Sequence, residues 1–566
     1  MQPIDRHALE KNRLALGEAD LLRGHGQGMG LFLAQTAEKW DQGLEELRDG
    51  HATRDHTKFD IFTGMNPAPR PDPGFLFMLG IYGRRPTRES VSLLRETNAS
   101  GVLLLARNIE SPAQVRDLTR GLVDAVGRPI LFAVDHEGGW VLRFASGVTA
   151  FPGNAALGRA RDPKLAYATG RQMALELSPL GIGMNLAPVV DVHAARYNPG
   201  IGIRSFGSDP ALVGRLGSAF LRGLQDHGVA ACAKHFPGKG AATVDAHVAL
   251  PTIRLPRREF FATHLTPFAA AARAGVAAVM TTHVRCPAFD RKPASFSRRI
   301  THDLIRSRLG FDGAVISDDL CMGAVTTRGP VPAAALDAFR AGHDVIMIAH
   351  DPGAQREAVE LFRAAHADGE LPADELAQSC RRIKKLLSYA RRRRAAANPA
   401  AGARLALQVA RKAATVARRG TIPLPLPDGA RRTLVLLPNF PEVRERFTFE
   451  DGPNGPGAFM RRAFIERGRY RLMFTPVESP QAGPWREAIR AADHVVFFCF
   501  EAMRFAGQRA VLDFINRQAP DRAVACLIRS SFDLGLLDPR ITVIDACGYR
   551  LCQLQAAGEL IFGRRP

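Results

Sequence analysis

Short apolar runs alternate with amphipathic segments along the chain from residue 75 onward. The runs are rich in Val, Ile, Leu and Phe, which is typical of strands buried on both faces. Helical periodicity fills the segments between them, as in SPAQVRDLTRGLVDAV. Eight such units predict a (β/α)8 TIM-type barrel, with a doubly wound sheet as the competing fold. The runs occupy residues 75–79, 102–106, 130–134, 184–190, 229–233, 276–280, 314–317 and 345–349.

A second set of apolar runs predicts a smaller α/β sandwich domain with a mainly parallel sheet. These runs occupy residues 433–438, 494–500, 524–528 and 541–546, and we expect no polar cluster at their ends comparable to that of the first eight. The predicted organisation is an N-terminal extension and linker at 1–72, a catalytic barrel at 73–390, a linker at 391–405 and the second domain at 406–566.

Polar residues follow most of the first eight runs, at the points where the predicted strands end. Barrels of this type build their active sites at the carboxyl ends of the strands, so these residues predict a site. They are Asp135, His136 and Glu137 after the third run, Asp191 after the fourth, Lys234 and His235 after the fifth, Thr281, Thr282 and His283 after the sixth, Asp318 and Asp319 after the seventh, and His350 and Asp351 after the eighth.

Composition narrows the class of protein. The chain has 566 residues and a formal net charge of +20, but the excess is mostly scattered Arg and no nucleic-acid-binding motif accompanies it. It contains no apolar run long enough to span a membrane and no secretory signal, so we expect a cytoplasmic protein. The eight cysteines form no Cys-x-x-Cys pair and are expected to be buried free thiols.

The stretch KHFPGKGAATVDAHVALP places Lys234, His235, Asp245 and His247 close together. A metal site is one reading, but the spacing matches no metal template. Phosphate binding by the Pro-Gly-Lys-Gly loop is another, although it lacks the full Walker pattern. Glycoside chemistry fits better, because Asp318 can serve as a nucleophile and an imidazole can donate and then accept a proton.

In that interpretation His247 carries the proton. Asp245, two residues away in an extended loop, would hold the ring in one tautomer. The glycines at 238 and 240 would let the loop move over a bound sugar.

These residues resemble glycoside hydrolase family 3 β-N-acetylglucosaminidases of the two-domain type. The resemblance covers residues 75 to 390 and rests on stretches such as VDHEGGWVLRF, NPGIGIRSFGSDP, KHFPGKG with VDAHVALP, and LGFDGAVISDDLCMGA. It implies Asp318 as the nucleophile, His247 as the mobile acid/base and Asp245 as its partner. It also implies a group that holds the sugar hydroxyls, made of Asp135, Arg143, Arg204, Lys234 and His235.

Two residues depart from the family pattern. Lys239 stands where the family usually has His, and Trp140 stands where it usually has Arg. We expect Trp140 to pack. Lys239 is expected to be partly solvated at the mouth of the site, where it either favours an anionic aglycone or has no role.

The resemblance implies a retaining exo-enzyme that releases terminal N-acetylglucosamine from muropeptides or chito-oligosaccharides, with no cofactor and no metal. Two alternatives remain open. One is a phosphorylase that uses phosphate as acceptor, and the other is a non-catalytic glycan-binding homologue. The expected partner is an N-acetylglucosamine-containing glycan, with no nucleic acid and no membrane, and the sequence leaves the oligomeric state open.

Overall fold

The first eight strands form a closed parallel barrel in the computed structural model, which describes residues 72–195, 198–244, 246, 249–390, 398–426, 432–443, 455–466 and 470–563. Neighbouring strands follow the order β7-β6-β5-β4-β3-β2-β1-β8. A parallel bridge between Ile316 and Val345 joins the two ends of this order. The predicted (β/α)8 barrel is therefore confirmed, and the doubly wound sheet is excluded for this part of the chain. The strands are β1 (Phe77–Gly80), β2 (Gly101–Leu104), β3 (Leu131–Val134), β4 (Ile182–Asn185), β5 (Ala230–Phe236), β6 (Ala278–Thr281), β7 (Ala314–Ile316) and β8 (Ile346–Ile348).

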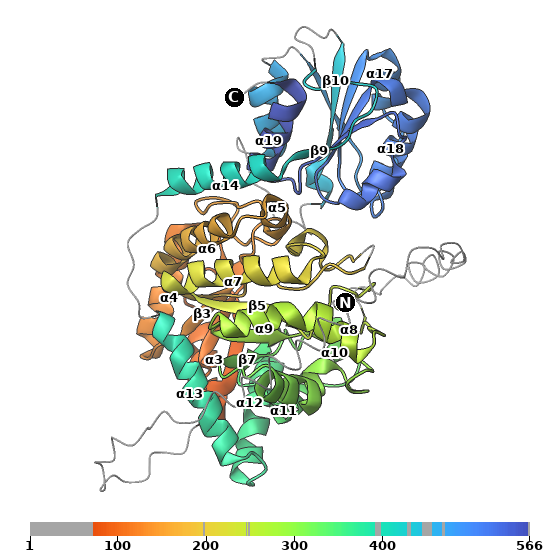
Figure 1. Cartoon of the computed structure of the whole chain (residues 1–566). Helices are drawn as coiled ribbons and strands as arrows, with labels where there is room; N and C mark the ends of the chain where they lie inside the picture. The colour runs from red at the N-terminus through yellow and green to blue at the C-terminus, as the bar shows by residue number, and fades with distance from the viewer. Residues whose placement is uncertain are drawn as a thin grey trace. The chain divides into compact units, whose positions relative to one another are not determined.

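Every residue of these strands is buried, which explains why they read as continuous apolar runs rather than alternating ones. The helices surround them (Figure 1). They are α3 (Arg88–Thr97), α4 (Pro112–Val126), α5 (Asn154–Ala160), α6 (Pro163–Leu177), α7 (Pro210–Asp226), α8 (Arg257–Glu259), α9 (Thr266–Arg273), α10 (Gly323–Thr326), α11 (Val331–Arg340), α12 (Pro352–Ala367) and α13 (Ala373–Ala390).

Helix α4 shows how local sequence sets the boundaries of these elements. The Ser111 side chain accepts a hydrogen bond from the backbone N–H of Gln114, and Pro112 occupies the first turn. Gly127 ends the helix at φ 79°, a left-handed conformation that glycine adopts without steric cost. Between these ends, Val115, Leu118 and Leu122 are buried against the barrel.

A second sheet follows, with the order β11-β10-β12-β13-β14-β9. All neighbours are parallel except β14 and β9, which run antiparallel. The four predicted strands are present, whereas β9 and β11 were not predicted. The strands are β9 (Thr415–Arg418), β10 (Thr433–Pro438), β11 (Arg471–Thr475), β12 (His494–Cys499), β13 (Ala523–Leu527) and β14 (Thr542–Asp545).

Helices cover both faces of this sheet, with α17 (Trp485–Ala491) and α18 (Ala506–Gln518) on one side and α19 (Leu551–Phe562) on the other (Figure 1). The side chains of β10 alternate between two apolar clusters. Val435 and Leu437 pack in the cluster that contains α19, and Leu434 and Leu436 pack in the cluster that contains α17 and α18. This arrangement is the predicted α/β sandwich.

The structure also bears on the expected linker and on the cysteines. Helix α14 (Pro399–Ala413) begins inside the segment expected to be a linker, so residues 399–405 are helical. All eight cysteines are free, and six of them are buried, as the composition predicted. Among the described residues, no helix combines the length and the apolar character needed to cross a membrane.

Candidate active site

Charged side chains from β5 and from the loop after β3 meet in a largely buried cluster at the carboxyl end of the barrel. Lys234 Nζ lies 2.7 Å from Asp135 Oδ1 and 2.6 Å from Glu137 Oε1. Arg143 approaches the other oxygen of Asp135, at 3.2 Å. The side chains of Lys234 and Glu137 are each only 2% exposed, so one ammonium group serves two carboxylates away from bulk solvent.

Arg204, on the loop between β4 and α7, extends this cluster. Its Nε and one terminal nitrogen donate to the two oxygens of Glu137, both at 2.8 Å, in a bidentate pair. The same nitrogen lies 3.2 Å from His235 Nε2, and His235 Nδ1 lies 2.7 Å from Asp191 Oδ2. The result is one continuous chain of contacts from Arg143 to Asp191.

The cluster holds its members in their charged forms. Burial alone would raise the pKa of Asp135, but the charges of Lys234 and Arg143 hold it well below its usual range. The pKa of Glu137 is lowered too, because Arg204 and Lys234 outweigh its burial. Burial would lower the pKa of Lys234, whereas Asp135 and Glu137 raise it. Fixed charges of both signs therefore face the mouth of the barrel near neutral pH.

At Asp191 burial outweighs the neighbouring charges in setting the pKa. It is completely buried, and burial raises its pKa to about 6, although Lys239 and two backbone N–H groups act in the opposite direction. Those N–H groups belong to His235 and Lys239 and lie 3.2 and 2.6 Å from its oxygens. Asp191 therefore fixes the His235 ring and the start of the following loop together.

Asp318 follows β7 and is partly exposed. Its Oδ1 accepts the N–H of Asp319 at 2.9 Å. Its charge acts on the pKa of Cys232, as do the charges of Lys234 and Asp135. Asp318 thus lies within electrostatic range of the cluster.

The residues beside Asp318 are tied to the backbone. Asp319 Oδ1 accepts from the N–H groups of Cys321 and Ala349, at 3.1 and 2.9 Å. His283 is fully buried, with Nε2 lying 3.1 Å from the Asp319 carbonyl and Nδ1 lying 2.8 Å from Ser295 Oγ. Both side chains support the Asp318 segment.

The loop after β5 differs from expectation at Lys239. Lys239 is only 6% exposed, so the expected partial solvation is wrong. Its backbone is drawn inward by Asp191, and Asn198 Nδ2 donates to its carbonyl at 2.8 Å. Gly240 packs so closely on Val192 that a Cβ atom would lie 1.6 Å from the Val192 carbonyl oxygen. In this arrangement, close packing leaves no room for a side chain at position 240.

The structure thus brings five predicted residues into one cluster, Asp135, Arg143, Arg204, Lys234 and His235, with Asp318 across the mouth. Asp245 and His247 lie outside the described residues. The sequence placed Glu137 and Asp191 among the polar residues at the strand ends, but gave neither of them a role in holding the sugar. The signal for both was their position shortly after the third and fourth apolar runs. Within the described ranges, no three potential ligand side chains are grouped as a metal site.

Trp140 packs, as expected, and does so against the second sheet. Its ring lies 4.0 Å from the guanidinium carbon of Arg529 and borders the apolar cluster that contains α19. Next to it, Arg550 Nε donates to the Gly139 carbonyl at 2.5 Å. The loop that carries Glu137 and Arg143 is therefore held from both domains.

Comparison with known proteins agrees with this arrangement. Residues 73–386 match the model of the glycosyl hydrolase family 3 N terminal domain. A beta-hexosaminidase of Nitrosomonas eutropha is 36% identical over 317 residues, covering 53% of this chain and 91% of that protein. One of Hydrogenovibrio crunogenus is 39% identical over 264 residues, covering 46% and 74%.

Solved structures extend the likeness to both sheets. A family 3 beta-N-acetylglucosaminidase from Paenibacillus sp. str. FPU-7 superposes with a TM-score of 0.81 at 29% identity, covering 88% of this chain and 98% of that one. The two-domain architecture is thus shared along nearly the whole described chain.

Proposed function

Because this chain belongs to glycosyl hydrolase family 3 and is a glycoside hydrolase, we propose that it is a retaining exo-β-N-acetylglucosaminidase. Its substrate would be the terminal N-acetylglucosamine of muropeptides or chito-oligosaccharides. The relatives named above, hexosaminidases and an N-acetylglucosaminidase, support this choice of sugar.

The proposal is supported by the placement of charges at the carboxyl ends of the barrel strands: a cluster of fixed charges joins β5 to the loop after β3, and the partly exposed Asp318 follows β7 of the same barrel. Asp135, Lys234 and Arg143 present acceptors and donors in a rigid geometry suited to the vicinal hydroxyls of a pyranose. Arg204 and His235 would complete this clamp. A sugar ring held there would have its anomeric carbon toward Asp318.

The proposed reaction has two steps. Asp318 attacks the anomeric carbon and forms a glycosyl ester while His247, oriented by Asp245, protonates the leaving oxygen. The same imidazole then removes a proton from water, which attacks the ester and releases the sugar with its original configuration.

The experiment is hydrolysis of an aryl N-acetyl-β-D-glucosaminide, with the configuration of the first-formed product followed by NMR. We expect release of the β-anomer. First-formed α-anomer would contradict retention, and inactivity on this substrate alongside activity on an aryl glucoside would contradict the choice of sugar. Inactivity on all substrates would favour the glycan-binding alternative. A sugar 1-phosphate formed in phosphate buffer would favour the phosphorylase.

The role of His247 has its own test. Replacing it with Ala should slow substrates with poor leaving groups far more than activated aryl substrates, because a good leaving group needs little protonation. Azide should partly restore the second step, since an external anion needs no general base. Equal losses on both kinds of substrate would count against His247 as the acid.

A further inference from the structure

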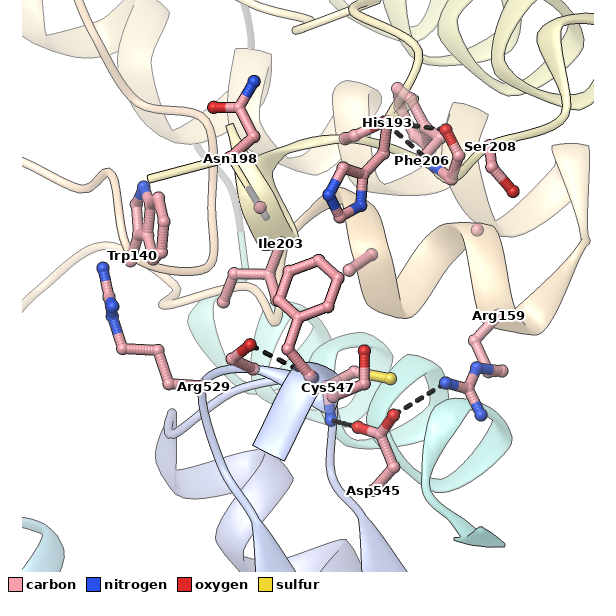
Figure 2. Close-up of a pocket in the computed structure, with 18 of the residues that line it drawn as sticks. Trp140, Arg159, His193, Asn198, Ile203, Phe206, Ser208, Arg529, Asp545 and Cys547 are labelled. Carbon is pink, nitrogen blue, oxygen red and sulfur yellow. Dashed lines mark hydrogen bonds and ion pairs between the residues drawn. The ribbon is translucent and has the colours of Figure 1, made fainter. Parts of the chain in front are cut away.

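A cavity of about 390 Å³ lies beside the catalytic cluster, between the barrel and the second sheet. Figure 2 shows its lining: Trp140, His193 and Asn198 come from the barrel, and Arg529 and Asp545 come from the sheet. Its volume is within the range of small-molecule sites. None of the proposed catalytic or sugar-binding side chains is among the described residues that line this cavity.

Topology places this cavity where parallel sheets bind ligands, outside the carboxyl ends of the strands. Glu501 follows β12, Arg529 and Ser530 follow β13, and Asp545 ends β14. The second sheet thus has charged residues at its strand ends, in separate ion pairs rather than in a branched cluster like that of the barrel. The barrel supplies the opposite wall through α5 and the loop between β4 and α7.

The charges of the cavity are balanced. Arg159 lies 2.7 Å from Asp545, Arg161 lies 3.9 Å from Asp209, and Arg529 pairs with Glu501. Each of these arginines therefore faces a carboxylate that also lines the cavity. An anionic ligand would have to displace or approach those carboxylates, so the lining favours a neutral ligand.

The remaining lining combines hydroxyl groups with aromatic surface. Ser208, Ser530 and Ser531 contribute hydroxyls, and Trp140 and Phe532 contribute rings. His193 meets Phe532 edge-on at 5.1 Å, and its buried Nε2 has no hydrogen-bond partner among the described residues. Aromatic rings pack against the C–H faces of a sugar, while hydroxyls, imidazole and paired charges hydrogen-bond its edge.

We propose that this cavity is an accessory site for one neutral saccharide unit of the N-acetylhexosamine class. The choice of that sugar rests on the proposed function, whereas the neutral and polyhydroxylated character of the ligand rests on the cavity itself. The site is separate from the catalytic centre but shares a wall with it.

That wall is the loop between β4 and α7. Asn198 lines the cavity, and its Nδ2 donates to the carbonyls of Lys239 and Gly240 at 2.8 and 3.2 Å. Arg204, between the lining residues Ile203 and Ser205, holds Glu137. A sugar in the cavity would therefore contact the segment that carries part of the catalytic cluster.

Equilibrium dialysis with radiolabelled N-acetylglucosamine tests the site in the full chain. We expect two equivalents bound to the wild type and one to Ser531→Trp, whose indole would fill the cavity. Phe532→Ala, which removes one aromatic wall without adding bulk, should weaken the second equivalent at least five-fold. The matched control is Ser479→Trp, an exposed serine of the same domain away from the cavity, which should still bind two equivalents.

A single equivalent in the wild type that Ser531→Trp still binds, or two in Ser531→Trp with unchanged affinity, would overturn the proposal. N-Acetylmuramic acid, which carries a carboxylate, should bind the second site more weakly than N-acetylglucosamine, and tighter binding would overturn the neutral class. The aryl-glycoside assay keeps this result apart from the proposed function. Ser531→Trp should retain wild-type turnover in the absence of added sugar, whether or not the accessory site exists.

Discussion

Both sheets place charged residues at the carboxyl ends of their strands, but the two sets are connected differently. In the barrel, Lys234 contacts two carboxylates and Arg204 contacts a carboxylate and an imidazole. In the second sheet, Asp545 lies against Arg159 and Arg529 against Glu501. A polar strand end therefore does not by itself identify a catalytic group. In the barrel cluster one side chain contacts two partners, whereas the residues beside the cavity form separate pairs, and this difference distinguishes the two sets.

The largest expected effect of a substitution at the strand ends is at Asp318 in the barrel. Replacement by Asn removes the anion needed for covalent catalysis and should lower turnover by about 10⁴-fold, with circular dichroism and the unfolding temperature unchanged. Steady-state rates on the aryl substrate measure the effect. A variant that keeps more than about a tenth of the wild-type rate, free of contaminating enzyme, would show that the nucleophile lies elsewhere.

Breaking the branched cluster should also destabilise the barrel. Lys234→Met leaves the buried Glu137 and the partly buried Asp135 without their shared cation, which should cost about 3–5 kcal/mol in the free energy of unfolding. Urea denaturation measures it. The matched control is Lys412→Met, whose partner Asp162 lies at 2.8 Å in a much more exposed pair and whose loss should cost less than about 1 kcal/mol. If both variants lost the same free energy of unfolding, the barrel cluster would contribute no more to stability than a surface ion pair.

The second sheet should influence catalysis through its contact with the loop after β3. Arg550→Met removes the donor to Gly139 and should lower kcat/KM about ten-fold, mostly through a higher KM, because Asp135 and Arg143 flank that loop. Arg550→Lys should restore part of the loss. Arg540→Met, an exposed arginine of the same domain, should leave both constants unchanged. A loss confined to the unfolding temperature would make the contact purely structural.

The smallest effect concerns Asp191 and pH. Its pKa is about 6 in the folded chain and about 3.9 when unfolded, so the folded state binds the proton more tightly. Wild-type stability should therefore fall relative to Asp191→Asn as the pH rises through 6, by about 1 kcal/mol between pH 5 and pH 7.5. Urea denaturation of both proteins at the two pH values measures this difference. A change of opposite sign would mean that hydrogen bonds, rather than burial, set the pKa.

The sequence predicted the central strands because they are buried on both faces and read as continuous apolar runs. It did not predict β9 and β11, which are the two edges of the second sheet and are only partly buried. A short strand such as TVAR, with polar residues at both ends, carries too little apolar pattern to be distinguished from a loop.

The candidate site divides in a similar way. The charged residues of the cluster were found from their positions and from the family resemblance, but their pairing was not. Glu137 links Lys234 to Arg204, residues 97 and 67 positions further along the chain, and only the closed barrel brings them together. The buried state of Lys239 likewise depends on Asp191, which lies 48 residues away.

The contact between Arg550 and Gly139 also has a consequence for how the protein is made. Its two partners are separated by 411 residues, and β9, the strand that opens the second sheet, pairs with β14, the last strand of the described chain. At about 5–20 residues per second, the ribosome needs roughly 20–80 s between synthesising one partner and the other. In the later part of that interval, after β8 ends at Ile348, the barrel strands are complete while the loop beside the sugar clamp still lacks its donor. A nascent chain truncated after β8 should thus contain a barrel whose catalytic mouth has not yet reached its final form.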